Sequence, residues 1–100
     1  MSKRPTITKM NKRHTGNQYF THYFNFYTND PNFNEVRIWC WETWGPSTEL
    51  SEWLKDAAAA GISPDNKSHN LNYCWVNDQF NKRIYFGNQA AATHFALRWL

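Results

Sequence analysis

Alternating hydrophobic and polar residues predict four β-strands in this chain. Side chains of a strand point to opposite faces in turn, so a half-buried strand repeats with a period of two. Aromatic and β-branched residues follow this period in four segments, and turn-forming residues separate most of them. The four predicted strands are residues 18–27, 34–43, 70–77 and 82–86.

Two further segments repeat with the period of an α-helix. Between Pro46 and Gly61, apolar residues recur at spacings of three and four. Gly45 as the cap and Pro46 as the first helical residue suit the start of a helix, and Gly61 suits its end. The residues that share this apolar face are Leu50, Trp53, Leu54, Ala57 and Ala58. A second helix is predicted after Asn88, its expected N-cap. The apolar face of that helix consists of Ala91, Ala92, Phe95, Ala96 and Trp99.

The order of these elements is strand-strand-helix, twice. This order favours an α+β domain in which four strands form one antiparallel sheet and both helices cover one of its faces. The arrangement, ββαββα, is a permuted relative of the ferredoxin-like sandwich. The predicted domain spans residues 17–100, and residues 1–16 are predicted to be a basic, mobile arm.

The apolar composition supports a folded chain even though aliphatic residues are scarce. Ile, Leu, Val and Phe make up 18 of the 100 residues, below the roughly 20 % under which highly charged chains are disordered. The net charge is only +3, however, and the chain contains 18 aromatic residues. Because each buried aromatic side chain removes about 150–250 Å² from water, these residues can supply a core.

Alternation in the predicted strands separates the aromatic residues into two faces. Helices need apolar cover, so we expect the Phe, Val, Ile and Cys side chains, among them Ile38, Cys74 and Val76, to face the helices. The opposite face then presents tyrosine, tryptophan and arginine side chains. These candidate partner-binding residues are Tyr19, Tyr23, Tyr27, Arg37, Trp39, Trp41, Tyr73, Trp75, Arg83 and Tyr85.

Three interpretations of this aromatic face are open. Some of its side chains could pack under the arm or under residues 62–69, and an error of one residue in register would exchange the two faces of a strand. The face could be a protein interface, since Trp, Tyr and Arg are enriched at binding hot spots. It could also stack the bases of a single-stranded nucleic acid.

Basic residues are concentrated near the N-terminus. Residues 1–14 contain five basic residues and no acidic residue, which leaves six basic and eight acidic residues for residues 15–100. The basic residues of the arm are Lys3, Arg4, Lys9, Lys12 and Arg13. They could contact nucleic-acid phosphates, or they could form a solvated terminus. The acidic balance of the remaining residues disfavours nucleic acid as the partner.

The sequence contains no arrangement typical of catalysis or metal binding. Its four histidines lack metal-ligand spacing with Cys40 or Cys74, and both cysteines are expected to be buried free thiols. Phosphate-binding glycine loops and nucleophile motifs are also missing, so we expect no enzyme, no cofactor and no metal site. No segment reaches the roughly 20 apolar residues of a membrane span, and no signal-peptide core follows the arm, which favours a cytoplasmic protein without membrane contact.

Two short motifs resemble those of a known group of proteins. The strand Arg83-Ile84-Tyr85-Phe86 is followed by Ala92-x-x-Phe95-x-Leu97-Arg98-Trp99, and an earlier tryptophan-rich segment ends in Trp44-Gly45-Pro46. These motifs are similar to those of small uncharacterised accessory proteins encoded by tailed phages, in which a helix with Phe-x-Leu-x-Trp follows a strand. The resemblance covers about half of the chain and implies a small protein that acts in the host cytoplasm by binding.

The sequence therefore predicts a non-catalytic binding module that engages a host or phage protein through the aromatic sheet face. A homodimer formed through the same face is one variant of this prediction. The alternative is a single-stranded nucleic-acid-binding protein that uses the face together with the basic arm.

Overall fold

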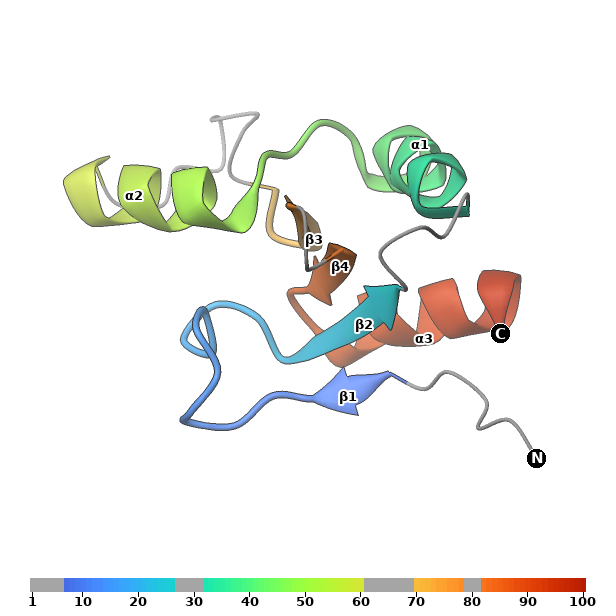
Figure 1. The fold of residues 1–100 in the computed structure, drawn as a ribbon, viewed down its shortest axis with the longest axis horizontal. Coiled ribbons are helices and arrows are strands. Elements are labelled where there is room, and N and C mark those ends of the chain that lie inside the picture. The colour runs from blue at the N-terminus through green and yellow to red at the C-terminus, as the bar shows by residue number, and fades with distance from the viewer. Residues whose placement is uncertain (1–6, 27–31, 61–69, 79–81) are drawn as a thin grey trace.

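The computed structural model describes residues 7–26, 32–60, 70–78 and 82–100. These residues form a sheet flanked by helices (Figure 1). The strands are β1 (Thr8–Lys9), β2 (His22–Phe26), β3 (Tyr73–Asn77) and β4 (Lys82–Phe86). The helices are α1 (Asn32–Trp44), α2 (Leu50–Ala60) and α3 (Gln89–Trp99).

The sheet has four antiparallel strands in the order β1-β2-β4-β3, so β2 and β4 are its inner strands. The register pairs Ile84 of β4 with Phe24 on one side and with Trp75 on the other, which places these three side chains on one face. Tyr85 is paired in the same way with Tyr23 and Cys74 on the opposite face. Both faces therefore carry large apolar side chains that need cover.

Helices cover both faces of the sheet. Phe24 and Ile84 pack with α1 and α3 in the larger hydrophobic core, which includes Phe95 of α3. Tyr85 packs on the other face in a second core with Trp53 of α2. Figure 1 shows α2 to the left of β3 and β4, and α1 and α3 to their right. The sheet is therefore the middle layer, and aromatic side chains fill the space on each side of it.

The segment predicted as the second strand, residues 34–43, belongs to α1, and this prediction is wrong. Its sequence fits a helical period as well as an alternating one. Phe33, Val36 and Cys40 are spaced by three and four, and they are the buried residues of the helix. Ile38, which alternation assigned to the core beside Val36, is exposed. Three and four are the spacings of neighbouring side chains on a helix, so the buried set follows the helical period.

Gly45, predicted to start the next helix, instead ends α1. Its φ of +93° lies in the left-handed region, which glycine adopts without a steric penalty. Its N–H donates to the carbonyl of Trp41 at 2.8 Å and so satisfies one of the last acceptors of the helix. α2 then begins at Leu50 rather than at Pro46.

The fourth strand of the sheet is β1, which lies in the segment predicted as a mobile arm. Thr8 of β1 pairs with Tyr23 of β2. The next residue after β1, Met10, is buried, and its N–H donates to the carbonyl of Thr21 at 2.8 Å. The fold therefore begins before residue 17, and residues 1–6 of the predicted arm lie outside the described residues.

The α+β class and the four-stranded antiparallel sheet are confirmed, whereas the helix count and placement are corrected. The described ranges contain three helices in the order ββααββα, so the prediction of two helices on one face is wrong, and the permuted ferredoxin-like arrangement is not confirmed. The predicted strand 82–86 matches β4, and Asn88 caps α3, since its Oδ1 accepts the N–H of Ala91 at 2.8 Å. Among the described helices, none has the length and apolarity needed to cross a membrane.

Hydrogen bonds fix the connection between α1 and α2 to the segment around β3. Tyr73 Oη donates to the Gly45 carbonyl at 2.7 Å, and Ser47 Oγ donates to the Tyr73 carbonyl at 2.7 Å. Asn70 Nδ2 donates to the carbonyl of Trp44 at 2.8 Å. Because the side chains of Tyr73 and Ser47 are buried, these bonds satisfy polar groups that water does not reach. They hold the C-terminal end of α1 beside β3, where the candidate site lies.

Candidate functional site

Within the ranges that the structure describes, the predicted aromatic residues do not form a single face of the sheet. Arg37, Trp39 and Trp41 lie on α1 and not on a strand. In β3, Tyr73 and Trp75 face α1, although the prediction had them pointing away from the helices. The register that pairs Trp75 with Ile84 requires this orientation, because side chains that are paired across strands share a face. The candidate binding residues are therefore distributed over several groups.

One group lies around Arg83 on the face of the sheet that α2 covers. Arg83 Nε donates to Asn25 Oδ1 at 3.2 Å, and Nη1 donates to Tyr85 Oη at 3.3 Å. The guanidinium carbon lies 4.6 Å from the centre of the Tyr23 ring, and the ring of His14 lies 5.4 Å from the Tyr23 ring. The hydrogen bond from Arg83 to Asn25 and the contact of Arg83 with Tyr23 link β4 to β2, so this group stabilises the sheet.

Three other predicted site residues pack against aromatic neighbours. Tyr73 is fully buried. Trp39 contacts several rings of α1 and α3 edge-on. The ring of Tyr19 lies 5.0 Å from that of Trp53, although Tyr19 stays exposed on its other side. Tyr27 lies outside the described residues. These positions contribute to packing rather than to one open surface.

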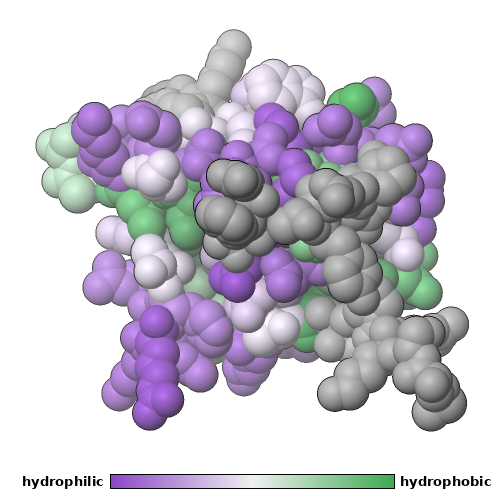
Figure 2. All heavy atoms as spheres, in the orientation of Figure 1, coloured by the Kyte–Doolittle hydropathy of each residue, from purple (hydrophilic) through white to green (hydrophobic). Residues whose placement is uncertain are grey.

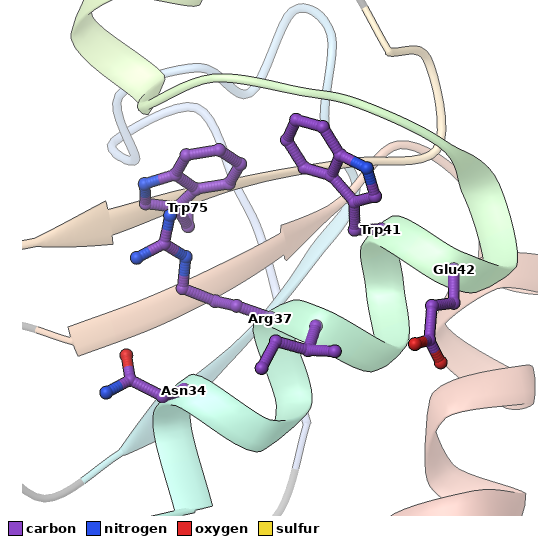
Figure 3. Close-up of a pocket in the computed structure, with 6 residues that line it drawn as sticks. Asn34, Arg37, Trp41, Glu42 and Trp75 are labelled. Carbon is purple, nitrogen blue, oxygen red and sulfur yellow. The ribbon is translucent and has the colours of Figure 1, made fainter.

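The remaining three predicted residues are Arg37, Trp41 and Trp75. They lie together in a groove between α1 and β3, which we call the α1–β3 groove (Figure 3). The residues that line it are Asn34, Arg37, Ile38, Trp41, Glu42 and Trp75. Its volume is about 510 Å³, which is within the range of pockets that bind ligands. The groove therefore combines apolar walls with an amide, one positive charge and one negative charge.

Arg37 is held at the groove by aromatic rings. Its guanidinium carbon lies 4.2 Å from the centre of the Trp75 ring and 5.8 Å from that of Phe33. Figure 3 shows the guanidinium against Trp75. Such a contact contributes about 0.5–1 kcal/mol at an exposed site and more when water is excluded. Arg37 Nε is buried and has no hydrogen-bond partner in the described part of the chain.

Trp41 and Ile38 form the exposed apolar side of the groove. Trp41 is 51 % exposed and Ile38 is 59 % exposed. In the view of Figure 2 most of the surface is hydrophilic, with hydrophobic areas at several places, a small one of them over α1 at the upper right. Neighbouring large apolar side chains that remain exposed are typical of surfaces that bind another molecule.

Sequence reasoning missed three residues of the groove, Asn34, Ile38 and Glu42. The pattern that would have identified them is present in the chain, because the α1 residues of the groove follow spacings of three and four and so form one stripe along a helix. They were missed because residues 34–43 were interpreted as a strand, in which alternate residues point to opposite faces.

The predicted basic residues lie away from the lining of the groove. Those that the structure describes are exposed: Lys9, Lys12 and Arg13. Lys3 and Arg4 lie outside the described residues. Burial lowers the pKa of His22, and the positive charge of Lys9, its partner in the β1–β2 register, lowers it further. None of the described basic residues of this segment lines the α1–β3 groove.

Cys40 and Cys74 are buried free thiols, and this prediction is confirmed. Burial raises the pKa of Cys40 to about 12, against a smaller opposite effect of the charge of Arg37, and burial also raises the pKa of Cys74. Because the thiolate is the reactive form of cysteine, neither side chain is suited to nucleophilic chemistry near neutral pH. Over the described ranges, no group of three or more His, Cys, Asp or Glu side chains could hold a metal ion.

Comparisons with known proteins do not assign the chain to a family. No protein-family model, no curated protein and no solved structure matches it. The α1–β3 groove is therefore interpreted from its own residues and geometry.

Proposed function

We propose that this protein is a binding module that engages a partner protein through the α1–β3 groove and has no catalytic activity of its own. The observation that carries the proposal is the meeting of two exposed apolar side chains, Ile38 and Trp41, with an arginine stacked on Trp75. Trp and Arg are enriched among the residues that dominate binding energy in protein interfaces. The resemblance to accessory proteins of tailed phages suggests a host or phage protein in the host cytoplasm as the partner.

The proposal revises the set of binding residues that the sequence predicted. Arg37, Trp41 and Trp75 are retained, and the three further lining residues join them. Residues with packed or hydrogen-bonded side chains, such as Tyr73 and Arg83, are proposed to support the fold instead. Substitution of the exposed groove residues Ile38 and Trp41 should therefore affect binding far more than it affects folding.

The test compares a groove variant with a matched control. The variant Ile38→Ser/Trp41→Ala removes the exposed apolar side of the groove, and Leu97→Ser removes an 83 % exposed apolar side chain from α3. Each tagged protein is used to capture proteins from an extract of a bacterial host, and the captured proteins are quantified by mass spectrometry. We expect the wild type and Leu97→Ser to retain the same partner and the groove variant to lose most of it. Equal recovery by the groove variant would contradict the proposal.

A homodimer is the variant of this proposal in which the partner is a second copy of the chain. Symmetric pairing would bury Trp41 and Ile38 of both copies against one another. Light scattering over a range of protein concentrations tests it, and a strict monomer at high concentration would exclude this variant while leaving a different partner protein possible.

Single-stranded nucleic acid is the second candidate partner, and the exposed Lys9, Lys12 and Arg13 are the observation that favours it. Phosphate contacts weaken as salt increases, so binding to an oligonucleotide should be strongest at low salt. Titration of a labelled oligonucleotide at two salt concentrations is the measurement, and absence of binding at low salt would remove this candidate.

A further inference from the structure

The guanidinium of Arg37 is oriented by aromatic rings but lacks a hydrogen-bonded acceptor within the described residues. Its Nε is buried without a partner, and its contacts in the chain are with the rings of Trp75 and Phe33. Stacking fixes the plane of a guanidinium but leaves its N–H groups to be satisfied by other atoms. Because Nε is enclosed, a partner can supply acceptors only to the terminal Nη N–H groups of this half-buried side chain, which lines the groove, and it gains binding energy by doing so.

We propose, on the basis of the groove function above, that Arg37 recognises a carboxylate of the partner segment, an Asp or Glu side chain, and that Ile38 and Trp41 contact an apolar side chain next to it. A carboxylate matches the planar guanidinium with two parallel hydrogen bonds. The Trp75 ring holds that plane before binding, so little conformational freedom is lost when the pair forms. The groove is therefore preorganised for an acidic residue flanked by an apolar one.

The charges along α1 favour a single carboxylate over the backbone of a nucleic acid. The helix contains two acidic residues, Glu35 and Glu42, and one basic residue, Arg37. Glu42 lines the groove, and in Figure 3 its carboxylate extends away from the guanidinium of Arg37. Interfaces that bind nucleic acid are strongly positive because they must neutralise successive phosphates. A chain of phosphates that contacts Arg37 would also be repelled by the negative charge of Glu42, whereas a peptide with one acidic residue can place its carboxylate at Arg37 and away from Glu42.

The test is a selection from a library of random displayed peptides for binding to the full-length protein. Selections run in parallel on the wild type, on Arg37→Met and on the groove variant Ile38→Ser/Trp41→Ala. Methionine keeps much of the aliphatic stem of arginine against the aromatic rings and removes the charge. We expect the peptides selected on the wild type to be enriched in Asp or Glu next to an apolar residue. On Arg37→Met, the acidic enrichment should disappear and the apolar enrichment should remain.

A matched pair of peptides then measures the contribution of the carboxylate. One selected peptide and a version with the corresponding amide in place of the acid are titrated against the wild type and against Arg37→Met. On the wild type we expect the amide version to bind about tenfold more weakly or worse, the loss typical of a hydrogen bond to a charged group. On Arg37→Met the two peptides should bind equally. The wild-type comparison changes only the peptide, so it stays informative even if Arg37→Met is unstable.

The outcomes separate this proposal from the groove function on which it rests. Apolar peptides without acidic enrichment that depend on Ile38 and Trp41 would overturn the carboxylate assignment and leave the groove function intact. Peptides that bind the groove variant as well as the wild type would overturn both. Binding of an oligothymidine that Arg37→Met abolishes would assign Arg37 to phosphate and overturn the acidic partner.

Discussion

Gly87 joins β4 to α3, and replacing it with alanine is expected to destabilise the fold strongly. A Cβ atom at this position would lie 1.8 Å from the carbonyl oxygen of Leu71 and 2.9 Å from its carbonyl carbon. Close carbon–oxygen contacts are about 3.3 Å, so the two backbone segments would have to separate by about 1.5 Å. That movement would break the hydrogen bond of 2.9 Å from the Gly87 N–H to the carbonyl of Asn72.

Two terms give the expected magnitude for Gly87→Ala. The lost hydrogen bond costs about 0.5–1.5 kcal/mol, and the displacement of packed backbone costs about 1–3 kcal/mol. The free energy of unfolding should therefore fall by about 3 kcal/mol, which lowers the melting temperature of a domain of this size by about 12–24 °C. Thermal and urea unfolding followed by circular dichroism measure both quantities.

Gly45→Ala is the matched control, because it places an alanine in an unfavourable backbone conformation without a steric clash at its Cβ. Gly45 has a φ of +93°, but the nearest atom to its added Cβ would be Asn70 Nδ2 at 3.9 Å. Only the left-handed backbone is then unfavourable, at about 1–2 kcal/mol. We expect Gly87→Ala to be clearly less stable than Gly45→Ala. The steric argument is refuted if Gly87→Ala unfolds at the wild-type temperature or above that of Gly45→Ala.

Three further predictions concern a cap, the groove and a buried thiol. Asn88→Ala removes the acceptor of the Ala91 N–H and should lower the free energy of unfolding in urea by about 1 kcal/mol. Asn88→Ser keeps a side-chain acceptor at the N-cap, so it should lower this free energy much less. Trp41→Ala should change that free energy by no more than about 0.5 kcal/mol because the side chain is half exposed, and a larger loss would show that Trp41 holds the fold. The pKa of Cys40, raised by burial from 9.0 to about 12, makes stability fall as pH rises above about 9, where the thiol of the unfolded chain ionises and that of the folded chain does not. Urea unfolding at about pH 8 and about pH 10.5 checks this, and equal stability at both would contradict it.

Local rules sufficed for the C-terminal part of the chain. The alternation of residues 82–86 matches β4, and Asn88 caps α3 through its own side chain. The signals that predict both elements therefore lie within a few neighbouring residues, although β4 itself pairs with the distant β2. The apolar face of α2 was also predicted, because Leu50, Trp53 and Ala57 are buried at helical spacings. In each case one pattern dominated its segment.

Residues 34–43 carry two patterns, and local rules could not choose between them. Val36, Ile38 and Cys40 alternate as in a strand, whereas Phe33, Val36 and Cys40 follow a helix. In the folded chain the segment is helical, because a helix packs Phe33 against Phe26 and leaves Ile38 at the surface. The centres of the two phenylalanine rings are 5.2 Å apart. The choice depends on contacts with β2, which the segment itself does not contain.

The candidate site was predicted only in part for the same reason. Arg37, Trp41 and Trp75 were expected on one surface because of their residue types, and the α1–β3 groove does bring them together. The reasoning behind that expectation was wrong, because it treated residues 34–43 as a strand, whereas they belong to α1. The three other lining residues could be found only once the helical stripe of α1 was known.

Periodicity and caps act over a few neighbouring residues, and they were enough to predict the α+β class, three of the four strands of the antiparallel sheet and two of the helices. Contacts between distant segments decide that helices cover both faces, that β1 completes the sheet and that Trp75 of β3 faces Arg37. A shift of one residue exchanges the faces of a strand, and its energy is set by partners distant in sequence. Those distant partners therefore decide which aromatic side chains hold the core and which form the groove.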